Sequence, residues 1–561
     1  MRVSSKKTIL AFAIASILLV APTYSAAKTT DTKNSEKKVI SKKIDEKKVK
    51  NVIMLIPDGA NISSYSLARW YEGGNPLAVD SILTGLVRTY NADTPIADSA
   101  PAGTAMSTGM KTNTKYVGVN PSVAGLYNVP EIVAGNEKKP LATVLEASKL
   151  LGKATGIVAT SNIQHATPAD FTAHTSDRSD YFGIGEQQVY NELDVALGGG
   201  SKYLEANNRP DKEDMIAELK NMGYEIVNTK DQLTTSKSSK LYGLFAPDAM
   251  AYDLDRAETA PTEPTLEDMT KKAIDTLAKN KNGFFLMVEG SKVDWSNHAN
   301  DPVATATDML AFDKAVNAAL EFAKKDGNTV VIVAADHGTG GLSMGNKDSS
   351  SNYDKLTLNQ FMDPIKAAKL TGEGLEKKLD KDRTNIVDVM KTYYGINDLT
   401  DDEIKSIKEA KEGSLNYTVG PIISKRAYIG WTTNGHTGEE VALYSYHPKN
   451  KTLNGLVQNT DIAKYIEEVL GLDLKKANEE LYNNVIPVLN EAGLNYYWNN
   501  NGNFVNPELV ITDDTHTLNL PANKDFYTLD GKKIKSSGIN VFVDGENFYV
   551  SKEIIDLFPK N

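Results

Sequence analysis

Three short segments carry side chains that together could hold a metal ion beside a nucleophile. Asp58 follows the apolar run VIMLI, and Ser99 begins a run rich in Gly, Ala and Thr. Asp336 and His337 follow a third segment, the apolar run VVIVAA. Carboxylates and imidazoles bind divalent metals, and metal coordination can activate a hydroxyl nucleophile. This combination is typical of a metal-activated serine that attacks a phosphate.

Further residues could complete such a site. Asp294 and His298 are spaced i, i+4, so one helical turn would point both side chains to the same side. An isolated pair of this kind is more often a surface pair, but Glu289 ends a strand-like run just upstream. His436 lies in a Gly-rich loop, which lets the backbone approach a ligand closely. Taken alone, a histidine in such a loop is more often simply exposed.

The segment after Ser99 is compatible with a helix, which places this serine near a helix N-terminus. Backbone N–H groups and the helix dipole favour both a bound phosphate and a serine alkoxide at that position. Serine is also a common N-cap residue, so the position alone indicates little. Ser99 becomes a candidate nucleophile only together with the metal ligands.

The elements that must position these residues follow an α/β pattern. Continuous apolar runs at residues 52–56, 154–159, 284–289 and 330–335 alternate with helix-like segments such as 142–149 and 265–277. Continuous rather than alternating apolar strands predict a sheet that is covered on both faces. Such sheets carry their sites at the carboxyl ends of the strands. Asp58, Glu289 and Asp336 all lie at that end of their runs.

The N-terminus predicts export. A short basic start precedes an apolar run at residues 9–20, which is too short to span a membrane, and Ala27 ends a small-residue cleavage site. We therefore assign residues 1–27 to a signal peptide, with an uncleaved anchor as the alternative. The mature chain, with no membrane span, would be extracellular or periplasmic. Residues 28–50 form a Lys-rich tether whose acidic residues dilute its charge.

Composition narrows the chemistry. The 561-residue chain has a formal charge of −11 and no cysteine. The charge argues against a general nucleic-acid-binding module. Without cysteine, any metal must be held by Asp, Glu, His and hydroxyl groups. The other histidines, His174, His447 and His516, lack such neighbours in the sequence, so we expect them to be structural.

With these motifs in view, the chain resembles bacterial alkaline phosphatases from about Asn51 to about Pro448. The resemblance rests on the order and spacing of PDG at 57–59, DSAPAGTAMSTG at 98–109, ATPAD at 166–170, AHTSDR at 173–178, VEGSKVDWSNH at 288–298, ADHG at 335–338 and HTG at 436–438. It implies an alkaline-phosphatase-like three-layer α/β sandwich with a mostly parallel central sheet.

We accordingly divide the mature chain into a catalytic domain at residues 51–451 and a small C-terminal α+β appendage at 452–561. Between residues 342 and 430 the strand signal fades, and short amphipathic helices take over. We interpret this part as a helical or irregular insertion that forms a cap or an interface.

The resemblance also implies roles for individual residues, with two Zn²⁺ ions and one Mg²⁺ ion as cofactors. The first zinc ligands would be Asp294, His298 and His436. The second zinc ligands would be Asp58, Asp336, His337 and the Ser99 oxygen. The ligands of the third ion, magnesium, would be Asp58, Thr167 and Glu289. Arg178 would grip the phosphate, and Asp98 would help to position it.

Two positions depart from the enteric members of the family. Where those enzymes have an aspartate this chain has His165, and where they have a lysine it has Trp295. Imidazole is a softer donor than carboxylate, so the third site should bind Mg²⁺ more weakly or take Zn²⁺. We therefore expect activation by added Mg²⁺. His165 is either a direct ligand or a hydrogen-bonded neighbour of the ligands, and Trp295 is either a neighbour of the phosphate or pocket-wall packing.

The resulting prediction is a broad-specificity phosphomonoesterase that acts on small phosphomonoester substrates through a phosphoserine, with a homodimer as the candidate assembly. A phosphodiesterase, a sulfatase or a phosphate-transferring mutase on the same core is the first alternative. The second is a non-enzymatic surface binding protein, in which the tether and the appendage make the contacts.

Overall fold

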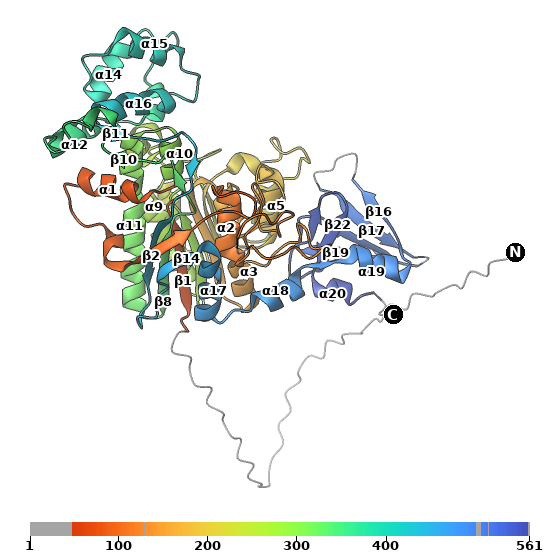
Figure 1. Cartoon of the computed structure of the whole chain (residues 1–561). Helices are drawn as coiled ribbons and strands as arrows, with labels where there is room; N and C mark the ends of the chain where they lie inside the picture. The colour runs from red at the N-terminus through yellow and green to blue at the C-terminus, as the bar shows by residue number, and fades with distance from the viewer. Residues whose placement is uncertain (1–47, 128, 501–505, 514, 559–561) are drawn as a thin grey trace.

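The computed structural model describes residues 48–558 except 128, 501–505 and 514 (Figure 1). The predicted signal peptide and most of the predicted tether lie outside these described residues. A ten-stranded sheet forms the centre, and only β13 runs antiparallel to its neighbours. The strand order is β14 (Gly455–Gln458), β2 (Leu83–Arg88), β13 (Val441–Tyr446), β8 (Thr329–Ala334), β1 (Asn51–Ile56), β7 (Phe284–Glu289), β3 (Ala154–Asn162), β4 (Val195–Gly199), β6 (Leu241–Leu244) and β5 (Glu225–Val227).

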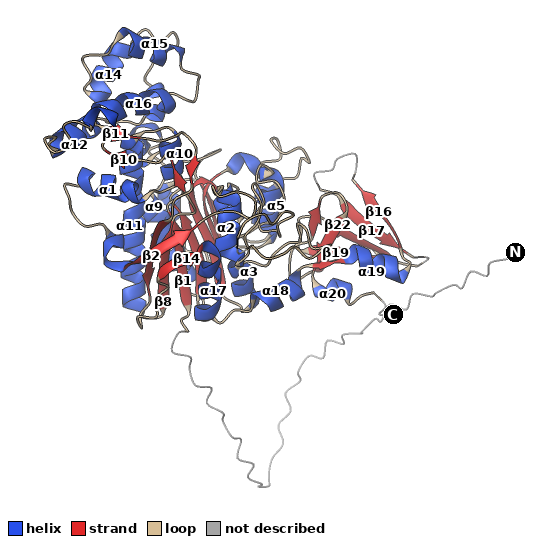
Figure 2. Ribbon diagram, in the orientation of Figure 1, coloured by secondary structure: helices blue, strands red, loops and turns tan. Residues whose placement is uncertain are grey.

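Helices cover both faces of this sheet, which confirms the three-layer α/β prediction (Figure 2). The central strands β1, β7 and β8 are buried along their whole length, as their continuous apolar runs predict. One face carries α1 (Ile62–Tyr71), α8 (Asp253–Thr259), α9 (Leu266–Leu277), α10 (Lys292–His298) and the long α11 (Pro302–Asp326). The other carries α2 (Ser99–Thr108), α3 (Val144–Leu150), α4 (Ala166–Ala169) and α17 (Asn459–Leu470).

Shorter elements complete this part of the chain. Three further helices are α5 (Tyr181–Tyr190), α6 (Met215–Asn221) and α7 (Lys230–Thr235), of which α6 contacts the edge strand β5 and α7 contacts α9. Two small antiparallel ladders join segments far apart in sequence: β9 (Gly338–Thr339) with β12 (His436–Thr437), and β10 (Ser343–Met344) with β11 (Ile429–Gly430).

The segment that we interpret as an insertion is helical. It contains α12 (Leu358–Lys366), α13 (Gly372–Glu376), α14 (Ile386–Tyr394), α15 (Asp401–Glu409) and α16 (Asn416–Arg426). Their apolar residues form a core of their own together with Leu67 of α1 and Val303 of α11. In Figure 1 these helices stand at the top of the molecule, beyond the carboxyl ends of the parallel strands.

The C-terminal boundary differs from the sequence-based one after residue 451. β14 is an edge strand of the central sheet and α17 packs on α2, so the α/β unit extends to about Leu472. Local composition could not show this, because β14 pairs with β2 from the far end of the chain. We call residues 473–558 the C-terminal unit.

The C-terminal unit has its own apolar core and two antiparallel sheets (blue and violet in Figure 1). One sheet contains β15 (Asn483–Asn484), β22 (Asn547–Val550) and β21 (Val541–Val543). The other runs through β16 (Asn495–Asn499), β17 (Glu508–Thr512), β18 (Thr517–Pro521), β19 (Phe526–Leu529) and β20 (Lys532–Lys535). Its helices are α18 (Leu474–Leu481), α19 (Val485–Ala492) and α20 (Lys552–Ile555). Among the described residues, no helix has the length and apolar character needed to cross a membrane.

Candidate active site and metal centre

Three neighbouring strands bring the predicted carboxylates together. β1 lies between β8 and β7, with Leu55 paired to Val333 and Ile56 paired to Glu289. The chain beyond β1 and β8 therefore leaves the sheet at the same edge, where Glu289 ends β7. Asp58, Glu289 and Asp336 are all completely buried.

Ser99 is the first residue of α2, with Asp98 as its N-cap. The serine is buried, and its Oγ lies 3.1 Å from His337 Nε2. The free N–H groups at this helix N-terminus surround the serine, which favours negative charge there. The structure thus places the candidate nucleophile against the carboxylate cluster.

Backbone oxygens orient the three predicted imidazole ligands. His298 Nδ1 donates to Asn434 O at 2.5 Å, and His436 Nδ1 donates to Ala97 O at 2.7 Å. His337 Nδ1 donates to Gly338 O at 3.3 Å. Each Nε2 atom is left to face the carboxylates, which is the usual arrangement around a metal-binding histidine.

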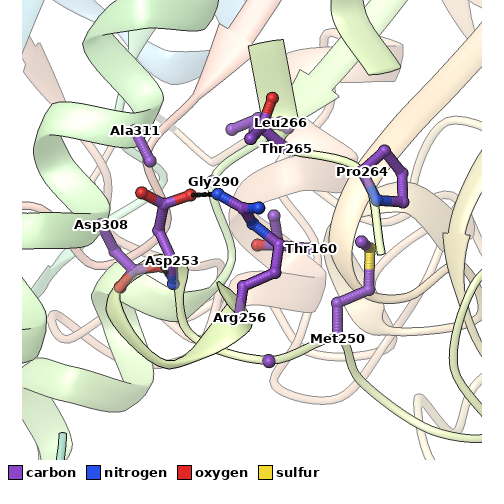
Figure 3. A pocket seen from close by; sticks show the side chains of 11 residues that line it. Thr160, Met250, Asp253, Arg256, Pro264, Thr265, Leu266, Gly290, Asp308 and Ala311 are labelled. Atoms are coloured by element: carbon purple, nitrogen blue, oxygen red, sulfur yellow. Dashed lines mark hydrogen bonds and ion pairs between the residues drawn. The ribbon is translucent and has the colours of Figure 1, made fainter. Parts of the chain in front are cut away.

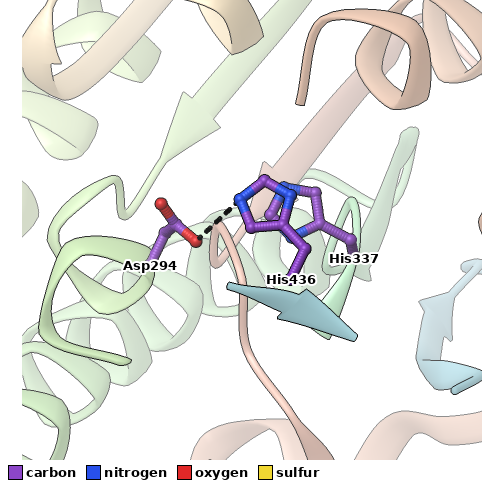
Figure 4. A group of neighbouring side chains, drawn as sticks. All are labelled: Asp294, His337 and His436. Carbon is purple, nitrogen blue, oxygen red and sulfur yellow. Dashed lines mark ion pairs between the residues drawn. The ribbon is translucent and has the colours of Figure 1, made fainter. Parts of the chain in front are cut away.

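The distances define overlapping groups of ligands. One group is Asp294, His337 and His436, whose ligand atoms lie within 4.8 Å of one another (Figure 4). His298 belongs to the same group by distance, because its Nε2 is 3.3 Å from Asp294 Oδ2 and 3.1 Å from His436 Nε2.

A second group contains Asp58, Asp336 and His337. His337 Nε2 lies 3.6 Å from Asp58 Oδ1 and 3.3 Å from Asp336 Oδ2. His337 is therefore near both groups and near Ser99. This sharing is consistent with two ions that are close together.

A third group contains Asp58, Glu289 and His165. The predicted ligand Thr167 is the second residue of α4, and His165 is the N-cap of this helix. Ser161 donates to Glu289 Oε2 at 3.4 Å. His165 thus joins the two carboxylates that the resemblance assigns to the third ion.

Several buried oxygens at these groups lack a hydrogen-bond partner among the described residues. These oxygens are the two carboxylate oxygens of Asp58, together with Asp336 Oδ2, Glu289 Oε1 and Thr167 Oγ1. A buried carboxylate without a partner is strongly destabilised, so this donor set fits divalent cations. Oxygen and imidazole donors without sulfur suit Zn²⁺ and Mg²⁺.

The pKa shifts of these residues in the absence of a metal ion also indicate a cation-binding site. Burial and then the charge of Asp336 hold the pKa of Asp58 well above its usual range. Burial raises the pKa of Glu289 to about 8. Burial opposes the charged form of Asp294 as well, but His298 outweighs it and holds that pKa below the usual range. The pKa of His298 rises to about 9, because Asp294 outweighs the effect of burial.

Arg178, the candidate phosphate ligand, is held from two sides. Its Nη1 donates to Asp98, and its Nη2 lies 3.2 Å from His165 Nε2. Burial, followed by the charge of Arg178, lowers the pKa of His165 to about 3, so this imidazole is neutral and can accept the hydrogen bond. Trp295 meets His165 edge-on, with ring centroids 5.8 Å apart.

Sequence reasoning missed three supporting residues. Thr339 donates to Asp294 Oδ1 at 2.6 Å and lies 3.2 Å from His337 Nδ1. Asn297 donates to Gly59 O at 2.9 Å and so fixes the turn after Asp58. Asp170 is fully buried and accepts from Thr104 of α2 at 3.0 Å. All three lie within or beside recognised motifs, but their contacts span the fold.

The cavity in Figure 3 is separate from this centre. It measures about 20 Å³ and contains none of the predicted site residues. The ion pair between Arg256 and Asp253, 2.9 Å long, lies on its wall beside Asp308. This volume suits about one water molecule, so the cavity is too small for a substrate.

Comparison with known proteins decides the family. The family model described as alkaline phosphatase matches residues 49–472, which is most of the chain. The chain belongs to the alkaline phosphatase family. Alkaline phosphatase 3 of Bacillus subtilis is 38% identical, and the match covers 77% of this chain and 92% of that protein. The repressible alkaline phosphatase of Saccharomyces cerevisiae is 31% identical, over 77% of this chain and 83% of that protein.

Solved structures agree with this result. The crystal structure of Thermus thermophilus alkaline phosphatase has a TM-score of 0.68 at 28% identity, covering 76% of this chain and 92% of that one. The cold-active alkaline phosphatase of a psychrophilic Shewanella species has a TM-score of 0.64 at 27% identity, covering 75% and 99%. The recognition, the fold class and the assignment as an enzyme are thereby confirmed. Alkaline phosphatases are metal-dependent hydrolases of phosphate monoesters, and the C-terminal unit lies outside the matched residues.

The raised pKa values predict how the metal-free alkaline phosphatase responds to pH. A group whose pKa is higher in the folded than in the unfolded state stabilises the fold at pH values below its unfolded-state pKa. This contribution is lost as the pH rises through its folded-state pKa. The pKa of Glu289 is raised from 4.5 to about 8, and that of His298 from 6.5 to about 9, so both groups contribute in this direction. The Tm of chelated protein should therefore fall between pH 6.5 and 9, by on the order of a few degrees.

Differential scanning calorimetry of chelated and metal-reloaded protein would check this. Reloading should flatten the decline, because bound cations stabilise the ionised carboxylates. Glu289→Gln should reduce the decline in the chelated protein. A chelated protein whose Tm rises across this window would contradict the prediction.

Packing under α2 predicts the effect of a single methyl group. A Cβ on Gly103 would lie 2.2 Å from Asp170 Oδ2, so Gly103→Ala must displace either the buried Asp170 side chain or α2, the helix that Ser99 begins. Overpacking typically costs about 1–3 kcal/mol. We expect at least a tenfold loss of phosphatase activity and lower stability to urea. Gly125→Ala, where the nearest atom is 4.0 Å away, is the control that should change neither.

Proposed function

We propose that this chain hydrolyses phosphate monoesters through a phosphoserine formed on Ser99. The observation that carries the proposal is the position of Ser99, at the start of α2 and 3.1 Å from His337 Nε2, inside the carboxylate and imidazole groups. Broad specificity follows if the site grips mainly the phosphoryl group. The alternatives on the same core differ in the group attacked, which a substrate panel can test.

The proposed cofactors are two Zn²⁺ ions and one Mg²⁺ or Zn²⁺ ion. Asp294, His298 and His436 would hold the first zinc. Asp58, Asp336, His337 and the Ser99 oxygen would hold the second. Asp58, Thr167 and Glu289 would hold the third, with His165 beside them. When bound, such ions lower the pKa of a hydroxyl and stabilise the negative charge on the attacking and leaving oxygens.

The protein's own groups perform the remaining work. Arg178 binds two phosphate oxygens with its planar guanidinium, which Asp98 keeps in place. The Ser99 oxygen attacks phosphorus, an O–P bond forms to Ser99, and the bond to the ester oxygen breaks, so the alcohol leaves. A water then attacks the phosphoserine, which releases inorganic phosphate and restores Ser99.

His165 governs the proposed third site. A neutral imidazole has one lone pair, and Arg178 uses the one on Nε2 in this structure. His165 Nδ1 is buried without a hydrogen-bond partner in the described part of the chain. Direct ligation would therefore require the ring to change tautomer or to release Arg178. In the alkaline phosphatase of the Antarctic bacterium TAB5, variants in which a histidine is replaced by glutamate or aspartate have Mg bound in the M3 site.

Export and assembly remain part of the proposal. We propose cleavage near Ala27 and an extracellular or periplasmic protein, on the sequence features of residues 1–27. The helical segment at residues 342–430 is the candidate interface of a homodimer, because it projects from the sheet as a separate core.

Removing the nucleophile tests the reaction. Ser99→Ala should lower kcat for p-nitrophenyl phosphate by several orders of magnitude, because no phosphoserine can form. The intact enzyme should prefer p-nitrophenyl phosphate to the bis-ester and to the sulfate. Acid-quenched enzyme with ³²P-labelled substrate should carry label on Ser99. Undiminished activity in Ser99→Ala, or a preference for the diester, would refute the assignment.

Changing one ligand tests the third site. His165→Asp adds a hard oxygen donor, so it should shift metal preference towards Mg²⁺ by about tenfold or more. Metal content by mass spectrometry and the rate during Mg²⁺ titration into chelated, zinc-reloaded enzyme would measure this. His447→Asn is a control at a histidine that we expect to be structural. Equal Mg²⁺ content in the wild type and His165→Asp would count against a role at this site.

A further inference from the structure

The segment that carries Arg178 contains little regular structure of its own. Residues 171–180 link α4 to α5, and their main backbone pairing is the isolated bridge between Val117 and Thr175. Arg178 N also donates to Lys115 O at 3.0 Å. The position of the guanidinium must therefore depend on tertiary contacts made by this loop.

The first such contact is buried and comes from the C-terminal unit. Tyr482, just after α18, donates from its hydroxyl to Glu146 Oε1 at 2.5 Å and lies 2.6 Å from His174 Nε2. His174 Nε2 is itself 3.0 Å from Glu146 Oε1. All three side chains are buried, and the rings of His174 and Tyr482 meet edge-on at 4.7 Å. His174 is therefore structural, but its partner lies more than 300 residues away.

A second contact holds the backbone of the same loop. Gln187 of α5 accepts from His174 N at 2.7 Å and donates to His174 O at 3.1 Å. Its amide nitrogen also donates to Asn523 Oδ1 at 3.0 Å. Asn523 belongs to the C-terminal unit and is buried at this contact. The C-terminal unit therefore also contacts Gln187, the side chain that holds the backbone of His174.

A third contact reaches the loop two residues before Arg178. Ser176 donates to Asp544 Oδ1 at 3.1 Å, in the turn between β21 and β22. The other Asp544 oxygen forms an ion pair with Lys138 Nζ at 2.5 Å. This contact is partly exposed, so it should contribute less than the buried ones.

We propose that the C-terminal unit positions Arg178, so that it sets the affinity of the active site for phosphate. The inference rests on the proposed role of Arg178 and assigns Tyr482, Asn523 and Asp544 as positioning residues. Tyr482 and Asp544 contact the loop directly, and Asn523 contacts it through Gln187. None of the three belongs to the catalytic groups. Figure 1 shows the C-terminal unit beside α5, the helix that follows Arg178.

Tyr482→Phe is the principal test, made in the full-length, metal-loaded protein. It removes one buried hydroxyl and keeps the ring, so the fold should persist. We expect KM for p-nitrophenyl phosphate and the inhibition constant of inorganic phosphate to rise at least fivefold, with kcat changed less than twofold. Tyr527→Phe is the matched control, because it removes the hydroxyl of another buried tyrosine of the same unit, which packs in the unit's own apolar core. The control should leave both constants unchanged.

Asp544→Ala and Asn523→Ala test the same inference independently, in case Tyr482→Phe destabilises the fold. Asp544 is partly exposed, and its removal should raise both constants by about twofold while the Tm stays constant. A general loss of stability would lower the Tm and the active fraction without separating KM from kcat. If all three variants bind phosphate as tightly as the wild type, the inference is wrong.

A double-mutant cycle with Arg178→Lys separates this inference from the proposed function. If the contacts act through Arg178, Tyr482→Phe should have no further effect on phosphate inhibition in the Arg178→Lys background. Additive effects would overturn the positioning role but leave the function intact. An unchanged inhibition constant in Arg178→Lys alone would instead reject the role of Arg178 in the proposed function.

Discussion

The burial of several carboxylates together at the strand ends is the constraint on which the site depends. β8, β1 and β7 are adjacent, so their carboxyl ends bring Asp336, Asp58 and Glu289 into one buried cluster. Ionising all of them without cations carries a large desolvation penalty, as the raised pKa values of Asp58 and Glu289 indicate. Compensating positive charge therefore stabilises a sheet that assembles these groups at neutral pH. The fold and metal binding are therefore linked.

The same requirement accounts for the histidines. A metal ligand must present a lone pair in a fixed direction, and backbone carbonyls supply that direction here. Ala97 orients His436, and Asn434 orients His298, although each pair is separated by more than 130 residues. The short β9–β12 ladder brings the loop of His436 next to that of His337. The segment from 340 to 435 thus returns the chain to the site after forming the helical core above it.

Sequence reasoning succeeded where the information is local. Continuous apolar runs predicted β1, β7 and β8 to within one residue at each end, whereas β3 extends three residues beyond its predicted run. The i, i+4 spacing predicted a helical turn, which lies in α10. It failed where a residue acts through the fold. Asp170 and Gly103 meet across two helices, which no local pattern encodes. β14 was assigned to the appendage for the same reason, because its pairing partner is more than 300 residues away.

Arg178 illustrates how these levels combine. A guanidinium has five N–H donors in a fixed plane, and two groups already hold it here. Asp98 accepts from one donor and is the N-cap of α2, so it links the arginine to the start of the helix that carries Ser99. His165 takes another, and its low pKa keeps it neutral, so it orients Arg178 without adding positive charge or repelling it. In the described part of the chain Asp98 and His165 are the hydrogen-bond partners of this guanidinium, which leaves its remaining donors for the phosphate oxygens that we propose it binds. The departure from a carboxylate at position 165 therefore exchanges a hard metal ligand for a neutral acceptor that directs the arginine.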